Sequence, residues 1–216
     1  MSNTLELVLN PTTATSVQKA LLTLPNPPEL DVCVQASEPV DNALNGVRTH
    51  CRVRVEGELG DFCGMSFGEA EAQIDGSVGH YFAHSLQSGL IVVRGNAKDS
   101  LGALGCGGLL AVYGSAADRV GVGLQGSDII VRGNVGALAG VGMQSGTLII
   151  GGNAGQELGK GLGGGTIYLR GEAASVSPDV EEVRGKESDK LRIGLLMLKA
   201  GIKAAGKDFK VFRSVH

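Results

Sequence analysis

Short apolar runs alternate with glycine along this chain on a fixed period. Runs of four or five mostly aliphatic residues, such as Leu90–Arg94 and Asp128–Arg132, are each closed by a glycine. These glycines recur every 19 residues, at Gly57, Gly76, Gly95, Gly114, Gly133, Gly152 and Gly171. Short β-branched runs closed by glycine are typical of strands. A strand this short must stack on similar neighbours to bury its face, so the period predicts a parallel β-helix with one coil per 19 residues. We expect the repeated glycines at tight corners that need a positive φ.

Alternation within each strand predicts which side chains face the interior. The expected inward positions are Ile91, Val93, Leu110, Val112, Ile129, Val131, Leu148, Ile150, Ile167 and Leu169. The expected outward positions are Val92, Ala111, Ile130, Ile149 and Tyr168. This outward stripe is more apolar than contact with water requires, so either the C-terminal tail or a partner protein should cover it. A polar ladder borders it at Asp75, Arg94, Tyr113, Arg132 and Arg170.

An apolar centre with a charged rim is the composition expected of a protein interface. A 29 Å solenoid, at about 4.8 Å per coil, is longer than one short helix can cover. We therefore predict that the stripe binds a partner. The predicted interface residues are Val92, Arg94, Ile130, Arg132, Ile149, Tyr168 and Arg170.

The two ends of the chain depart from the repeat. Residues 1–50 are expected to form a small α/β cap, with strands at Leu5–Leu9 and Asp31–Gln35. A helix is expected between them over Val17–Leu24, with Ser16 as its N-cap. The β-helix itself is assigned to residues 51–175.

Residues 176–216 are expected to form a helical tail. A helix beginning at Ser188 would place Leu191, Leu195, Leu198 and Ile202 on one face. Such a tail would cap the solenoid, whose exposed terminal coil could otherwise recruit further strands.

Composition narrows the function classes. The chain has 216 residues, 35 of them glycine, with 43% apolar residues and a net charge of −3. That apolar content favours a folded domain over a disordered chain. The negative charge argues against nucleic acid or an anionic membrane as the main partner. No apolar run approaches the roughly 18 residues of a membrane span, and the N-terminus lacks a signal-peptide pattern, so a cytoplasmic protein is expected. Four cysteines, at 33, 51, 63 and 106, have no metal-binding spacing and are interpreted as reduced thiols.

Several motifs with possible chemistry have simpler structural explanations. Gly121–Gly126 spells G-x-G-x-x-G, but a coil and not a helix is expected after it, so we do not interpret it as a dinucleotide site. His80 and His84 lack the intervening glutamate of a zinc-protease pattern. Cys106 has no histidine nearby in sequence to activate it and is expected to be a small buried residue. No catalytic, cofactor-binding or metal-binding residue is therefore predicted on this chain.

Asparagines follow three of the repeated glycines, at Asn96, Asn134 and Asn153. Stacked coils would align them into a ladder of side chains or place each in a left-handed turn. Either arrangement is structural.

The repeated Gly-Asn-Ala/Val corners, together with their Gly-x-Gly partners, resemble the "GXGXG" domain over residues 57–171. That domain is the C-terminal β-helix of the glutamate synthase large subunit, and it also occurs in one of the subunits of formylmethanofuran dehydrogenase. The segments Gly105–Leu110, Gly142–Gly146 and Phe209–Arg213 are most similar to the free-standing β-helix subunit of N-methylglutamate synthases. One corner position, glycine in other coils, is Lys98 and Ala117 here, a departure that concerns only the local turn.

The resemblance implies a right-handed β-helix and a non-catalytic role. The subunit would belong to an enzyme complex that converts L-glutamate and methylamine to N-methyl-L-glutamate and ammonia. A class II glutamine amidotransferase-like subunit and an FMN-dependent, iron–sulfur synthase subunit are the implied partners in a hetero-oligomer. FMN and the iron–sulfur cluster would be held by the synthase subunit. The alternative is the corresponding β-helix subunit of a formylmethanofuran dehydrogenase or formyltransferase/hydrolase complex.

Overall fold

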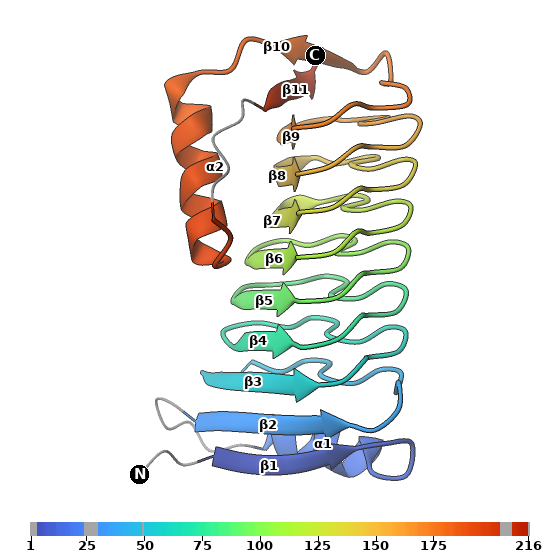
Figure 1. Cartoon of the computed structure of the whole chain (residues 1–216), viewed down its shortest axis with the longest axis vertical. Coiled ribbons are helices and arrows are strands. Elements are labelled where there is room, and N and C mark those ends of the chain that lie inside the picture. Colours follow the sequence, from blue (N-terminus) through green and yellow to red (C-terminus); the bar gives the residue numbers. More distant parts are fainter. Residues whose placement is uncertain (1–3, 24–29, 49, 204–208, 216) are drawn as a thin grey trace.

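A computed structural model describes residues 4–23, 30–48, 50–203 and 209–215 of the chain. The protein is mostly β and forms a solenoid of about seven turns, with roughly 19 residues per coil (Figure 1). The expected fold class, a single parallel β-helix, is confirmed. Each coil contributes one short strand to a common wall, because only stacking on the coils above and below buries its inner face.

The described strands form one eleven-stranded sheet, in the order β1-β2-β3-β4-β5-β6-β7-β8-β9-β11-β10. The sheet is parallel from β1 to β9, whereas β11 runs antiparallel to both β9 and β10. The strand bounds are β1 Thr4–Leu9, β2 Leu30–Ala36, β3 Cys51–Glu56, β4 Glu71–Ile74, β5 Leu90–Val93, β6 Leu109–Val112, β7 Gln125–Val131, β8 Ser145–Ile150, β9 Thr166–Leu169, β10 Val180–Val183 and β11 Lys210–Ser214. From Arg52 on β3 to Thr166 on β9, register partners along the wall are 19 residues apart, except at a register shift where Gln125 pairs with Ser145.

Coil stacking begins upstream of residue 51. The β2 strand also pairs with β3 in parallel, from Leu30 opposite Cys51 to Gln35 opposite Glu56, and the loop after β2 is bonded to the next coil. The amides of Asn42 and Gly46 donate to the carbonyls of Asp61 and Met65. The expected cap strands at Leu5–Leu9 and Asp31–Gln35 are confirmed as β1 and β2.

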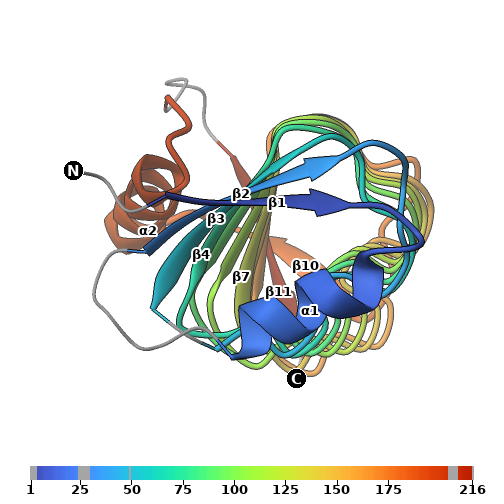
Figure 2. The ribbon, with the colours of Figure 1, turned by 90° about the horizontal axis from the view of Figure 1, so that it is seen from below.

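Helix α1, Ala14–Leu22, connects β1 to β2 and lies at the N-terminal end of the solenoid, which Figure 2 views end-on. It begins at Thr13 and not at the expected N-cap Ser16. The side-chain oxygen of Asn10 accepts hydrogen bonds from the amides of Thr12 and Thr13, which starts the helical turn earlier. The expected helix end at Leu24 lies outside the described residues. Helix α2, Glu187–Lys199, follows β10 close to its expected start.

The interior follows the predicted pleat. All ten expected inward strand positions are buried in one apolar core that runs through the coils. A second set of apolar residues closes this core from the opposite wall, for example Phe82, Leu124 and Met143. Stacked coils thus share a continuous interior.

The repeated glycines do not serve the predicted purpose. Among the seven, only Gly57 has a positive φ, at 125°. The others are glycine because the backbone of the preceding coil lies too close for a side chain. A Cβ on Gly95 would lie 2.6 Å from the carbonyl carbon of Gly76, and one on Gly152 would lie 2.7 Å from that of Gly133. The expectation of positive-φ corners at these glycines is therefore wrong, and close approach is the physical reason.

Positive φ occurs instead at a second corner, in three alternate residues of each coil. In one coil these are Arg119, Gly121 and Gly123, with φ of 58°, 66° and 62°. The G-x-G string thus forms a left-handed corner, because glycine adopts a positive φ without steric cost. Tyr81, Ala83 and other non-glycine residues occupy the same corner in other coils.

Candidate functional site

The outward face of the sheet has two halves of different character. On β3 and β4 its central positions are polar, Arg54 and Gln73, whereas from β6 to β9 they are apolar. Those apolar positions are Ala111, Ile130, Ile149 and Tyr168. Helix α2 lies along this second half and leaves the strands nearer the N-terminus uncovered (Figure 1).

Helix α2 buries the apolar half. Its side chains Ile193, Leu196 and Met197, followed by Ala200 and Ile202, form a second apolar cluster with the outward residues of the sheet. Ile130 and Ile149 are each 1% exposed and Tyr168 is 2% exposed. The sequence left open whether the C-terminal tail or a partner protein covers the outward stripe, and over these strands the tail covers it. The prediction that these three residues contact a partner protein is therefore corrected: they are packed against α2, and burial of each contributes about 1.5–3 kcal/mol to the fold.

Polar contacts fix α2 on the sheet. The Arg192 guanidinium donates from Nε to Thr147 Oγ1 at 2.8 Å and from Nη2 to Asp128 Oδ1 at 2.7 Å. At the other end of the helix, the Tyr113 hydroxyl lies 3.0 Å from the Ala200 carbonyl oxygen. These directional bonds set the helix in one orientation, which apolar packing alone does not do.

A buried carboxylate on α2 ties the helix to strands β9 and β11 of the sheet. Asp189 accepts hydrogen bonds from the Tyr168 hydroxyl at 2.8 Å, the Arg213 guanidinium at 2.6 Å and the Lys186 amide at 2.8 Å. Burial by itself raises the pKa of Asp189, but these three donors outweigh it and hold that pKa below its usual value. Burial, and then the hydrogen bond to Asp189, raises the pKa of Tyr168 to about 12. The carboxylate is thus ionised and the phenol neutral at physiological pH.

The remaining predicted interface residues lie at the margin of the covered half. Arg94, Arg132 and Arg170 are exposed, and Val92 on β5 is buried. The guanidinium carbons of Arg94 and Arg132 lie 4.3 Å and 5.3 Å from the Tyr113 ring centroid, so both cations stack on one aromatic side chain. Contact between these four residues and a partner stays a prediction.

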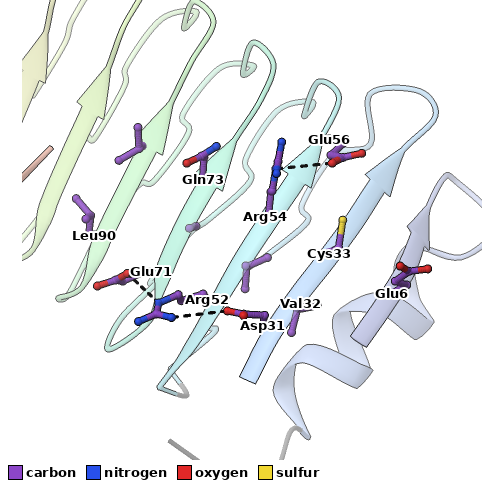
Figure 3. A pocket seen from close by; sticks show the side chains of 13 residues that line it. Glu6, Asp31, Val32, Cys33, Arg52, Arg54, Glu56, Glu71, Gln73 and Leu90 are labelled. Atoms are coloured by element: carbon purple, nitrogen blue, oxygen red, sulfur yellow. Dashed lines mark ion pairs between the residues drawn. The ribbon is translucent and has the colours of Figure 1, made fainter. Parts of the chain in front are cut away.

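The uncovered half carries a shallow groove of about 560 Å³ over β1 to β5 (Figure 3). Its floor is a network of ion pairs. Arg52 lies between Asp31 and Glu71, at 4.0 Å and 3.6 Å, and Arg54 pairs with Asp75 at 2.7 Å. The lining carries the carboxylates of Glu6, Asp31, Glu56 and Glu71 against only two guanidiniums, so both cations are paired and the groove has an excess of negative charge.

The other candidate residues occupy structural positions. His80 lies 3.9 Å from Asp99, and His84 is hydrogen-bonded to the Ser85 hydroxyl at 2.8 Å. Within the described residues, no group of three or more possible metal ligands comes together. Cys106 is exposed, so its expected burial is wrong: its coil turns the thiol outward toward Gln125.

The alignment of the three asparagines on stacked coils is confirmed, but their side chains bond to backbone amides and not to one another. Side-chain oxygens of Asn96, Asn134 and Asn153 each accept the backbone amide hydrogen of the residue one coil later, at 2.8 Å, 2.8 Å and 3.0 Å. None of the three has a positive φ, so the left-handed alternative is wrong. The ladder satisfies one amide per coil where the strands end.

Two surface features are not predicted by the sequence reasoning. Helix α2 exposes Leu191, Leu195 and Leu198 although its opposite face is already buried. Phe62 and Tyr81 stack on the left-handed corner with ring centroids 5.2 Å apart. The expected face is confirmed for the three leucines but is wrong for Ile202, which follows the end of α2 and is buried in the second apolar cluster. The signal for a second apolar face is the set Ile193, Leu196 and Met197.

Comparisons with known proteins do not assign a family. No protein-family model matches the chain, and a search of curated proteins finds no similar sequence. Neither described helix has the length and apolar character needed to cross a bilayer.

Proposed function

We propose that this chain is a non-catalytic structural subunit of a glutamate synthase-like enzyme complex, and that the complex is an N-methylglutamate synthase. The complex would convert L-glutamate and methylamine to N-methyl-L-glutamate and ammonia. The observation that carries the proposal is the regular stack of Gly-x-Gly corners at Gly121/Gly123, Gly140/Gly142 and Gly159/Gly161, all with positive φ. This is the corner pattern on which the resemblance to the GXGXG domain rests.

The surface is consistent with a scaffold role. Both arginines of the groove over β1 to β5 are paired with carboxylates, and the buried Asp189 is engaged in holding α2. A rigid solenoid gives fixed relative positions to proteins bound along it, and fixed geometry raises the rate of transfer between two sites. In this proposal the two sites belong to an amidotransferase-like subunit and an FMN-dependent, iron–sulfur synthase subunit.

Co-expression with subunits of those two classes tests the proposal. We expect one complex that forms N-methylglutamate from glutamate and methylamine, and we expect activity to be lost when this chain is omitted. The isolated chain should be colourless, with no stoichiometric FMN, iron or zinc. Full activity of the two other subunits alone would refute the scaffold role. Assembly with a molybdopterin or amidohydrolase-like subunit instead would favour the formyl-transfer alternative.

A further inference from the structure

Helix α2 is apolar on two opposite faces, but the solenoid covers only one of them. Ile193, Leu196 and Met197 face the sheet and are buried. Leu191 and Leu195, on the opposite side, are 65% and 52% exposed, and Leu198 is 74% exposed. An exposed apolar patch on a folded protein commonly marks an interaction site. The outer face of α2 therefore has the composition of a contact surface.

The three leucines have the spacing of a helix that inserts into a groove. They stand at positions i, i+4 and i+7, so they form one stripe along the helix. Gly194 lies beside this stripe, and no atom lies within 4 Å of the position that its Cβ would take. The glycine leaves room for a partner surface to approach the helix backbone. We refer to Leu191, Leu195 and Leu198 as the outer leucine stripe.

The segment that carries the outer leucine stripe has a net positive charge. Residues 184–203 contain six Lys or Arg against two Asp or Glu, a net charge of +4, whereas the whole chain carries −3. Arg192 is neutralised by Asp128 at 2.7 Å, and Lys190 pairs with Glu187 at 3.0 Å. Lys199 is exposed at the end of the helix. The rim of the stripe is basic on an otherwise acidic protein, so the complementary surface carries carboxylates.

This charge distribution selects among possible occupants. Antiparallel packing of α2 on a second copy would bring together two segments that each carry a net charge of +4. Like charges at an interface disfavour that partner. An anionic bilayer would attract residues 184–203 but repel the rest of the chain. The whole chain carries −3 and this segment +4, so the remaining residues carry −7. A protein groove with an apolar floor and an acidic rim satisfies both observations.

We propose that the outer leucine stripe docks into an apolar, carboxylate-rimmed groove on another subunit of the complex. This inference rests on the proposed function, which supplies the amidotransferase-like and synthase subunits as the possible hosts. The interface then differs from the one expected from the sequence: α2 lies between the sheet and the partner, so the sheet's apolar outward residues support the helix from beneath.

The test is binding of the purified chain to each of the two subunits and to their complex. Changing Leu191, Leu195 and Leu198 together to Gln should weaken binding about 100-fold or more, because anchors at the centre of an interface carry most of its affinity. The matched control is Leu22→Gln, an exposed leucine on α1 at the other end of the solenoid. Circular dichroism and the melting temperature check that both variants stay folded, as expected for exposed positions.

The basic rim gives a second, independent variant. Lys190→Glu with Lys199→Glu should slow association and reduce its dependence on salt, whereas the same two positions changed to Arg should bind normally. If the charge-reversed protein binds with unchanged affinity and salt dependence, the acidic-rim assignment is wrong.

The outcomes separate this inference from the proposed function. If the wild-type chain joins neither subunit, the proposed function fails and this inference fails with it. If the wild type assembles and the triple Gln variant assembles equally well, α2 is not the docking surface although the function stands. A stable dimer of the isolated chain that the Gln variant loses would assign the stripe to a second copy. Flotation with phosphatidylserine vesicles, lost in the same variant, would assign it to a lipid surface; either result overturns the proposal.

Discussion

Three glycine-to-alanine changes should separate the reasons for which this chain uses glycine. At Gly133 the φ is not in the left-handed region, but a Cβ would lie 2.7 Å from the Gly114 carbonyl oxygen and also contact Ser115 Oγ. At Gly142 the φ is 66°, yet the nearest atom to a Cβ is 4.0 Å away. At Gly194, inside α2, a Cβ meets nothing within 4 Å.

These geometries predict different magnitudes and signs. Gly133→Ala should destabilise by about 3 kcal/mol, the upper end of overpacking, because backbone of the adjacent coil and not a flexible side chain must move. Gly142→Ala should cost about 1 kcal/mol, the strain of a left-handed residue without a clash. Gly194→Ala should stabilise by about 0.5–1 kcal/mol, because alanine loses less entropy in a helix.

Urea unfolding of the three variants beside the wild type measures these differences, with calorimetry as a second probe. A protein of this size shifts its melting temperature by about 2–4 °C per kcal/mol, so Gly133→Ala should melt roughly 6–12 °C lower. Equal or greater stability of Gly133→Ala relative to Gly142→Ala would refute the close-approach explanation. Gly133→Val should be more destabilised than Gly133→Ala for the same reason.

Further predictions concern the cover and the thiols. Asp189 has a lowered pKa in the folded state, so the stability that its carboxylate contributes is complete above the usual carboxyl pKa of about 4 and is lost as the pH falls toward the folded pKa. The difference in urea midpoint between wild type and Asp189→Asn should therefore shrink at acid pH, and a larger difference there would contradict the assignment. Ellman's reagent should label the exposed Cys106 first and the buried Cys63, whose pKa burial raises to about 12, only on unfolding; a fast phase that persists in Cys106→Ser would show otherwise. Ile149→Asp would bury an unpaired charge under α2, so it should release the helix and expose its lysines to trypsin, whereas Leu195→Asp on the exposed face should not. Equal cleavage of both variants would mean that the sheet face does not hold α2.

The repeat makes the solenoid predictable because each coil contacts mainly its immediate neighbours. Register, the inward positions from Ile91 to Leu169 and the asparagine ladder all follow from a 19-residue translation, which is visible in the sequence. Helix α2 and the strands β1 and β2 are also recognisable from local patterns. These features depend on interactions within a coil or between successive coils.

Tertiary contacts decided what the period alone could not. The 19-residue spacing is compatible with two reasons for glycine at position 95, a positive φ or the lack of room for a side chain. The short distance from Gly95 to the backbone of Gly76 shows that the second reason holds. Likewise, an apolar stripe at Ile130 and Ile149 is compatible with cover by a partner or by the chain's own tail. In the structure α2 covers it, held by the hydrogen bond from Arg192 to Asp128, which lies 64 residues away in sequence. A side chain's cover is set by segments remote in the chain, because burial depends on distance in space and not on local pattern.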